Sequence, residues 1–250
     1  MFRKISTIDF KSSNTTSGKT VLIRVDYNVP VENELVTDDY RILKSIPTIK
    51  YCLDQGAKVV LMSHMGRPKG KVNRNYSLIP AGEKLAELLE VPIKFSEDCI
   101  SEDAIDVSKN LKDGEIHLLE NLRFHNEEIE NNSDFSSQLA KHGSIYINDA
   151  FGTAHRAHAS TSVIADFFPN HKMFGLLLQN EIISVEKLLN SPDASKEIDQ
   201  RDKAMIEMLY ATGMSISELV NLKITDIDMN RSVIKVMGKA SKERLIPFGE

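Results

Sequence analysis

The stretch SIYINDAFGTAHRAHAS, residues 144–160, decides the fold because it joins a short apolar run to a polar loop. The run SIYI has the β-branched and aromatic residues of a buried strand. The loop that follows places His155, Arg156 and His158 among Gly, Ala, Thr and Ser. A buried strand that leads into such a loop is typical of a parallel α/β sheet, whose ligand-binding groups gather beyond the carboxyl ends of the strands.

Four further apolar runs resemble the first, and helical patterns separate most of them. The runs are TVLIRV (20–25), AKVVLM (57–62), EIHLL (115–119) and MFGLLL (173–178). Residues 39–56, 79–90 and 134–143 instead carry apolar side chains at helical spacing. Pro47 lies within the first of these patterns and should kink that helix or mark its start. Strands separated by helices predict an α/β fold with a doubly wound, mostly parallel sheet.

The pattern changes after a helical segment at about 179–190, which runs into the break-prone residues Ser191 to Ala194. Two short helical patterns follow, and then two alternating strands joined by a hairpin-like loop. Their sequences are RDKAMIEMLYATG (201–213), SISELVNL (215–222), SVIKV (232–236) and ERLIPF (243–248). A tail of about 55 residues is small for an independent core, so we expect a small helical and β-hairpin fragment after the sheet.

Composition narrows the classes of function. The formal net charge is −5, so an anion site must be a local basic cluster against an acidic background. Neither a signal-peptide run nor a membrane-spanning run occurs, and the two cysteines, Cys52 and Cys99, have no metal-like spacing. We therefore expect a cytoplasmic protein without a membrane segment, a disulfide framework or a metal site.

Cationic and polar side chains follow successive strands of the expected sheet. Arginine guanidinium groups match phosphate and carboxylate oxygens with two parallel hydrogen bonds, which a lysine cannot do. Gly66 and Gly152 lie in the same loops and leave room for a ligand to approach the backbone. The sequence therefore predicts an anion site. The side chains that follow the strands, or begin the first helix, are Asp26, Tyr27, Asn28, Arg41, His64, Arg67, Arg123, His125, His155, Arg156 and His158.

The same residues also allow other interpretations. A lone loop arginine is usually a solvated surface residue, and only the convergence of several favours a site. His155 and His158 would suggest zinc only with a third ligand, and no suitable partner follows from the sequence. Neither GxxxxGK[ST] nor GxGxxG occurs, so the sequence shows no nucleotide-phosphate loop.

The same motifs resemble a known family. RVDYNVP, DDYRI, LMSHMGRPKG, YSLIP, LLENLRFH and NDAFGTAHRAHAS occur in order and resemble the amino-terminal domain of phosphoglycerate kinase over about residues 5–190. The resemblance implies a Rossmann-like domain that binds 3-phosphoglycerate or 1,3-bisphosphoglycerate. It places the substrate ligands of the family at Asp26, Asn28, Arg41, His64, Arg67, Arg123 and Arg156. It also implies that Arg41 neutralises charge on the phosphoryl group during transfer, whereas His155 and His158 shape the loop or make interdomain contacts.

One departure from the family pattern bears on catalysis. The second domain of the family, with its nucleotide lysines, glycine-rich phosphate loop and magnesium-binding aspartate, should follow residue 190, and nothing resembling it appears. We therefore expect this chain to bind no cofactor itself. ATP or ADP and Mg²⁺ would need a separate nucleotide-binding domain, and turnover by this chain alone is not expected.

The tail, from about residue 199 to 250, resembles the opening of the catalytic domain of tyrosine site-specific recombinases. The catalytic arginine of that family falls on Ser215, and its hairpin lysine falls on Lys239. The later His/Arg motif and the nucleophilic tyrosine lie beyond this sequence, and Tyr210 occupies a helix-core position instead. Residues 195–250 carry nine basic and nine acidic side chains, and a net charge of zero argues against nucleic-acid binding.

We therefore expect a phosphoglycerate-kinase-type domain at 1–190, a junction at 191–198 and a partial recombinase-like segment at 199–250. The leading hypothesis is a domain that binds a small phosphorylated carboxylate, with phosphoryl transfer to ADP in glycolysis implied by resemblance. Two alternatives stay open. One is a non-catalytic metabolite-binding module or an inert fusion remnant, and the other is a DNA-binding protein defined by the tail.

Overall fold

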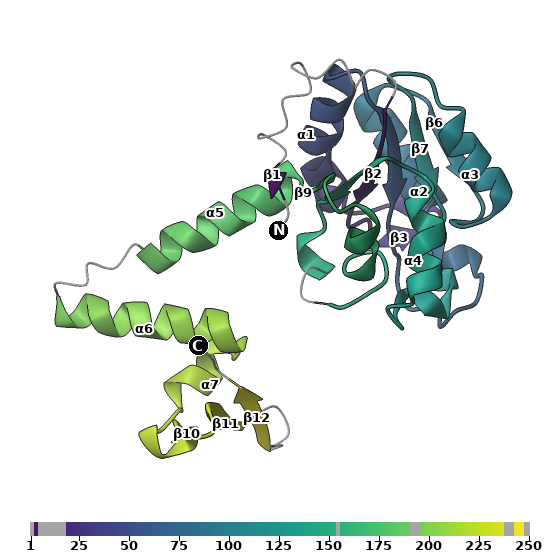
Figure 1. The fold of residues 1–250 in the computed structure, drawn as a ribbon. Helices are drawn as coiled ribbons and strands as arrows, with labels where there is room; N and C mark the ends of the chain where they lie inside the picture. The colour runs from purple at the N-terminus through teal and green to yellow at the C-terminus, as the bar shows by residue number, and fades with distance from the viewer. Residues whose placement is uncertain (1–2, 5–18, 154–155, 191–195, 238–242, 248–250) are drawn as a thin grey trace. The chain divides into compact units, whose positions relative to one another are not determined.

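The computed structural model describes residues 3–4, 19–153, 156–190, 196–237 and 243–247. The chain divides into two compact units, which we call unit 1 (Met1–Glu181) and unit 2 (Ile182–Glu250) (Figure 1). Among the described residues, no helix combines the length and the apolar character needed to cross a membrane.

Unit 1 contains a seven-stranded sheet in which every neighbouring pair of strands is parallel. In spatial order the strands are β1 (Arg3–Lys4), β9 (Lys172–Phe174), β8 (Ile145–Asn148), β2 (Thr20–Arg24), β5 (Lys58–Met62), β7 (Ile116–Leu119) and β6 (Ile93–Ser96). The prediction of an α/β fold with a doubly wound parallel sheet is confirmed. Sequence reasoning missed the short strands β1 and β6.

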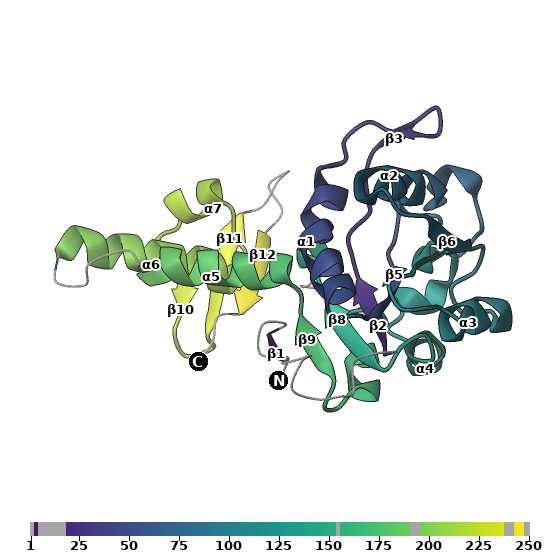
Figure 2. The same ribbon diagram turned by 90° about the horizontal axis from the view of Figure 1, so that it is seen from above.

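Helices cover both faces of this sheet, as the view from above shows (Figure 2). They are α1 (Tyr40–Asp54), α2 (Ile79–Leu89), α3 (Glu102–Lys109) and α4 (Ser133–Ala140). Side chains alternate across β2, so that Val21 and Ile23 join the core under α1 and α2, and Leu22 joins the core under α3 and α4. Burial of each such side chain contributes about 1.5–3 kcal/mol.

Two helix boundaries differ from the sequence expectation. Helix α1 begins at Tyr40 and contains Pro47 in its interior, so this proline does not mark the start. The run MFGLLL is not one strand, because β9 ends at Phe174 and α5 (Leu176–Asn190) begins two residues later. The side chains of Thr48 and Asp149 accept hydrogen bonds from the first backbone N–H groups of α5, at Leu176 and Leu178. These distant caps favour the helix where an apolar run alone suits either structure.

The remaining elements of unit 1 are short. Strands β3 (Val31–Glu32) and β4 (Leu35–Val36) form an antiparallel hairpin. In the described part of unit 1, five 3₁₀ helices lie in the connecting loops, namely η2 (Arg74–Tyr76), η3 (Leu122–Phe124), η4 (Asn126–Glu128), η5 (Phe151–Thr153) and η6 (Val163–Phe167). Three of them, η3, η4 and η5, follow the carboxyl ends of β7 and β8, where the candidate residues cluster.

A buried chain of hydrogen bonds links the outer strands of unit 1 to α3. The Ser108 hydroxyl lies 2.9 Å from Nδ1 of His117 and 2.6 Å from Nδ1 of His142. The chain continues from His117 to the Ser96 hydroxyl and from His142 Nε2 to the carbonyl of Cys99. A carbonyl only accepts, so Nε2 of His142 carries the proton and both imidazoles fit the chain as neutral rings. Burial lowers the pKa of His117 to about 3 and that of His142 to about 4.

Unit 2 contains the two helices and the hairpin that the sequence predicts. Helix α6 (Glu197–Thr212) ends at Gly213, whose φ of +61° suits a residue without a side chain. Helix α7 (Ile216–Val220) and the 3₁₀ helix η7 (Ile224–Asp226) follow. An antiparallel sheet of β10 (Ile227–Asp228), β11 (Val233–Met237) and β12 (Glu243–Pro247) completes the unit. Its buried core is small and comprises Met214, Ile234, Val236 and Ile246.

Candidate anion-binding site

The structure brings all seven residues that the resemblance implies to one cavity at the carboxyl edge of the sheet. Strands β8, β2, β5 and β7 are consecutive neighbours, so the loops after them meet. The cavity has a volume of about 230 Å³. Its lining includes Asp26, Asn28, Arg41, His64, Arg67, Arg123 and Arg156, together with Gly66, Gly152 and Thr153.

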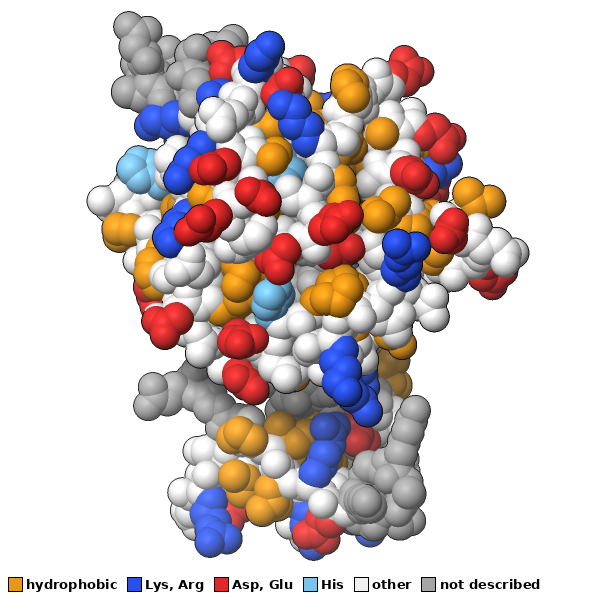
Figure 3. All heavy atoms as spheres, turned by 90° about the vertical axis from the view of Figure 1, so that its right-hand side faces the viewer, with side chains coloured by type: hydrophobic (Ala, Val, Ile, Leu, Met, Phe, Trp, Pro, Cys, Tyr) orange, Lys and Arg blue, Asp and Glu red, His pale blue; other side chains and the backbone are white. Residues whose placement is uncertain are grey.

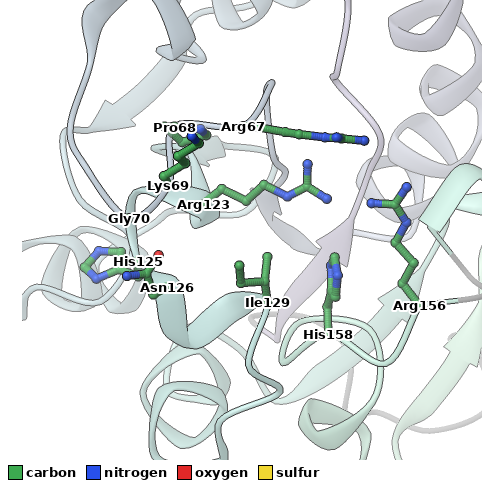
Figure 4. A pocket seen from close by; sticks show the side chains of 10 residues that line it. All are labelled: Arg67, Pro68, Lys69, Gly70, Arg123, His125, Asn126, Ile129, Arg156 and His158. Carbon is green, nitrogen blue, oxygen red and sulfur yellow. The ribbon is translucent and has the colours of Figure 1, made fainter.

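Three arginines also share an adjoining cavity of about 340 Å³. In the close view, the guanidinium groups of Arg67, Arg123 and Arg156 point toward one another, and His158 lies beside Arg156 (Figure 4). Burial, and then the charges of Arg24 and Arg156, lower the pKa of Arg123. So many cations are held together only at an electrostatic cost, which an anion between them would relieve.

On the face of unit 1 that Figure 3 shows, acidic and basic side chains are interspersed rather than gathered by sign. This agrees with the overall net charge of −5. The arginine cluster is therefore a local basic site, as the composition required.

Arg41 lies at the rim of the cavity. It follows the N-terminus of α1, and its Nη1 donates to Oδ2 of Asp26 at 2.5 Å. The Arg41 side chain is 49% exposed and that of Asp26 is 11% exposed. The ion pair holds the guanidinium in place while leaving one of its edges open to solvent.

At Gly66 and Gly152 the space that a side chain would need is filled by neighbouring side chains, and not left open for a ligand. A Cβ at Gly152 would lie 2.7 Å from Oδ2 of Asp26, and a Cβ at Gly66 would lie 2.3 Å from the ring of Tyr76. The φ of Gly66 is +59°, and its N–H donates to Oδ1 of Asn28 at 2.8 Å. Asn28 thereby ties the loop after β2 to the loop after β5, which fixes the spacing of the cavity wall.

His64 and Arg123 are the buried members of the set. His64 is 4% exposed and Arg123 is 8% exposed. Nη1 of Arg123 donates to the carbonyl of Gly66 at 2.8 Å, which aims the guanidinium into the cavity. Burial first, and then the neighbouring arginines, lower the pKa of His64 far below its usual range.

The loop after β8 contains two histidines, and the structure describes one of them, His158. His155 lies outside the described residues. His158 has Nδ1 3.8 Å from Oε1 of the buried Glu128, and its backbone N–H donates to the carbonyl of Arg156. These contacts suit the loop-shaping role expected for His158.

Sequence reasoning missed three polar residues beneath the cavity, namely Arg24, Glu128 and Ser160. Each is fully buried. One signal was present, because Arg24 is a charged residue in the otherwise apolar run TVLIRV. A buried charge needs partners, and the sequence alone does not indicate which residues supply them.

A cluster that could hold a metal ion lies elsewhere along this edge. Among the described residues, one group of ligand atoms from Asp98, Cys99 and His125 lies within 4.8 Å. The hydrogen bond between Asp98 and His125 lowers the pKa of Asp98 to about 2, and burial raises the pKa of the Cys99 thiol. Magnesium prefers oxygen ligands, so a set with a buried thiol and an imidazole does not fit the Mg²⁺ that kinase chemistry needs.

In unit 2, the position of the expected recombinase arginine has a structural role. The Ser215 hydroxyl accepts from the N–H of Glu218 and caps α7, and the Glu218 carboxylate accepts in turn from the N–H of Ser215. A serine bound in this capping box offers no guanidinium to a phosphate. Lys239 lies outside the described residues, and so does the side chain of Tyr210.

Two family models match the chain. Residues 11–197 match the model described as phosphoglycerate kinase, and residues 181–250 match that of the phage integrase family. Both resemblances inferred from the motifs are thereby confirmed.

Individual relatives agree with the first match. The chain is 50% identical over 177 residues to phosphoglycerate kinase from Chlorobium phaeobacteroides, covering 70% of this chain and 44% of the relative. It is 47% identical over 178 residues to that from Borrelia hermsii, covering 71% and 45%. The chain thus spans about half the length of the curated relatives it matches.

Solved structures give the same result for the fold. The phosphoglycerate kinase structure from Coxiella burnetii has a TM-score of 0.66 at 33% identity, over 78% of this chain and 46% of that one. The enzyme from Pyrococcus horikoshii OT3 gives 0.67 at 33% identity, over 78% and 47%. Since the family model matches most of the chain, this protein belongs to the phosphoglycerate kinase family.

Proposed function

We propose that unit 1 binds 3-phosphoglycerate and 1,3-bisphosphoglycerate in the cavity lined by the four arginines. The observation that carries this proposal is the convergence of Arg41, Arg67, Arg123 and Arg156 on one cavity of about 230 Å³. A three-carbon acid with a phosphate at one end and a carboxylate at the other presents two groups that guanidinium forks match. Each charge-assisted hydrogen bond contributes about 1.5–3 kcal/mol.

The position of Arg41 suits a role at the transferring phosphoryl group. It stands at the open rim, whereas Arg123 is buried. We infer that Arg67, Arg123 and Arg156, which share the adjoining cavity, hold the phosphate of the substrate. Arg41 then faces the phosphoryl group that is exchanged with the nucleotide. Fixed positive charge at this point stabilises the charge spread over the transferring oxygens.

The nucleotide half of the reaction is assigned to a separate domain. The kinase match ends at residue 197, and the integrase match covers the residues that follow. The metal-like cluster of the described residues does not fit magnesium. We therefore assign no step of nucleotide or magnesium chemistry to this chain, and unit 2 has no catalytic part in the proposal.

Calorimetric titration of the full chain tests the binding function. Addition of 3-phosphoglycerate should give a dissociation constant of roughly micromolar to millimolar size once ordering costs are subtracted. Glycerol, which lacks both anionic groups, is the matched control and should give no heat of binding. Absence of saturable binding at millimolar 3-phosphoglycerate would contradict the proposal.

A coupled assay with ATP and 3-phosphoglycerate tests turnover separately. We expect the chain alone to show no rate above background, because in-line transfer needs both substrates to be held by two closing domains. Addition of an isolated nucleotide domain from a relative should restore a measurable rate if unit 1 can pair with it. A robust rate without the nucleotide domain would refute the proposal that nucleotide chemistry needs a separate domain. If no rate appears when the nucleotide domain is added, a non-catalytic metabolite-binding module is favoured.

A further inference from the structure

Beneath the proposed anion site lies a fully buried arginine that has no direct part in lining the cavity. Arg24 ends β2 and is 0% exposed. Its Nε donates to the Ser160 hydroxyl at 2.8 Å, and its Nη1 donates to the carbonyl of Val25. Its Nη2 lies 3.0 Å from Nδ1 of His64. A buried guanidinium is tolerated only when such partners satisfy it.

The chemistry of arginine fixes the direction of each of these bonds. A guanidinium has only donors, so Nδ1 of His64 accepts from Arg24 and the neutral ring carries its proton on Nε2. The Ser160 hydroxyl likewise accepts from Arg24 and must donate onward, to Oε1 of Glu128 at 2.6 Å. Oε2 of Glu128 accepts from the N–H of Ser160 at 2.9 Å.

Glu128 supplies the counter-charge. Its side chain is fully buried, which raises its pKa, whereas the charge of Arg24 and the two hydrogen bonds from Ser160 favour the carboxylate form. The loop that contains Ser160 is also fixed by the backbone, because Ala159 N–H donates to the carbonyl of Glu128 and the Tyr146 hydroxyl donates to the carbonyl of Ser160. We call Glu128, Ser160, Arg24 and His64 the buried polar chain.

The charged groups that act most strongly on His64 all oppose its protonation. Arg24 faces it from β2, Arg123 from η3, and Arg156 and His158 from the loop after β8. Burial acts in the same direction and is the largest cause. The ring therefore stays neutral through the range in which an ordinary histidine titrates.

We propose that Arg24, Ser160 and Glu128 are positioning residues that hold His64 as its neutral Nε2–H tautomer. His64 then gives the anion site a hydrogen-bond donor without a charge, while the arginines supply the charge. The part of this inference that places an anion beside His64 rests on the proposed function. The tautomer of His64 does not. The consequence of the inference is that titration of His64 does not change anion binding.

Nitrogen-detected NMR of the histidine rings tests the tautomer on the full chain without any ligand. Of the seven histidines, the ring whose signals vanish in His64→Gln should show an unprotonated Nδ1 and a protonated Nε2. It should not titrate between pH 5 and 8, the range of ordinary histidine titration. An Nδ1–H tautomer, or a titration midpoint of about 6.5, would overturn the proposal. This measurement needs no substituted protein other than the one used for assignment.

Ser160→Ala tests the positioning role. The variant removes the acceptor of Nε of Arg24 and the link to Glu128, so the hydrogen bond from Arg24 to His64 should weaken and the Nδ1 signal of His64 should shift. Ser108→Ala is the matched control, since Ser108 is an equally buried serine that bonds two other histidines. The control should leave the His64 signals unchanged. A His64 spectrum in Ser160→Ala identical to that of the unmodified chain would show that Ser160 does not position it.

Binding of 3-phosphoglycerate tests whether the donor matters more than the charge. Gln can place an amide N–H near the position of Nε2, whereas Leu cannot, so His64→Gln should bind about tenfold more tightly than His64→Leu. Equal losses in both variants would contradict a neutral donor. If the unmodified chain binds no 3-phosphoglycerate, the proposed function fails, while the tautomer measurement still decides the positioning of His64.

Discussion

Replacing Arg156 with alanine should weaken binding of 3-phosphoglycerate by about a hundredfold, because two charge-assisted hydrogen bonds of about 1.5 kcal/mol each disappear. Arg156 lines both the cavity with Arg41 and the adjoining one with Arg67 and Arg123. Arg156 itself is exposed, so its truncation should leave the core intact. Calorimetric titration of the full chain measures the change directly.

Two companion variants separate charge from geometry. Arg156→Lys keeps the charge but loses the planar fork, and it should bind with intermediate affinity. Arg74→Ala removes an equally exposed arginine that lies in η2 and lines neither arginine cavity. It should bind as the unmodified chain does. Similar losses in Arg74→Ala and Arg156→Ala would mean that general charge, not a built site, attracts the anion.

Acidification from pH 6.5 to 4 should destabilise unit 1 by several kcal/mol through its buried histidines, among them His117 and His142. The pKa of His117 is about 3 and that of His142 about 4 in the folded chain, against about 6.5 when unfolded. Between these values the unfolded state binds more protons, so the free energy of unfolding falls as the pH falls. Each such group adds about 1.4 kcal/mol per pH unit to the slope, and its full contribution to stability is present above pH 6.5. His64 adds to the slope in the same direction, whereas the raised pKa of the buried Asp149, about 6, reduces it.

Urea unfolding followed by far-ultraviolet circular dichroism at a series of pH values measures this slope. His142→Gln keeps an N–H near the carbonyl of Cys99 but cannot titrate, and it should lower the slope by about 1.4 kcal/mol per pH unit. His171→Gln changes an exposed histidine and serves as the control. An unchanged slope in His142→Gln would show that carboxylates, rather than the buried imidazoles, cause the acid sensitivity.

The two histidine environments show how one residue type performs different work in this fold. His117 and His142 exchange hydrogen bonds with Ser108 in the core, and no arginine is among the main causes of their pKa shifts. His64 instead borders the arginine cavity and accepts from Arg24. All three are held neutral mainly by burial, but only His64 has its remaining N–H at a surface where a ligand can reach it.

Local patterns were sufficient for most elements of unit 1. The apolar runs at β2, β5, β7 and β8 are recognisable because strands covered on both faces need apolar residues throughout. The boundary between β9 and α5 was not predictable, because Thr48 and Asp149 cap that helix from positions distant in sequence. The short strand β6 was missed, since Ile93–Ser96 is neither continuously apolar nor fully buried.

The sequence by itself determined the chemistry of the site. Arginines, a histidine and an asparagine stand at the ends of successive apolar runs, and that order predicts an anion site in a parallel sheet. Which loops meet was decided by the tertiary structure, through the strand order β8-β2-β5-β7. The tertiary structure alone also placed Ser160 against Arg24, 136 residues away. Pairing of strands and satisfaction of buried charges are non-local, so no window of sequence contains the information that fixes them.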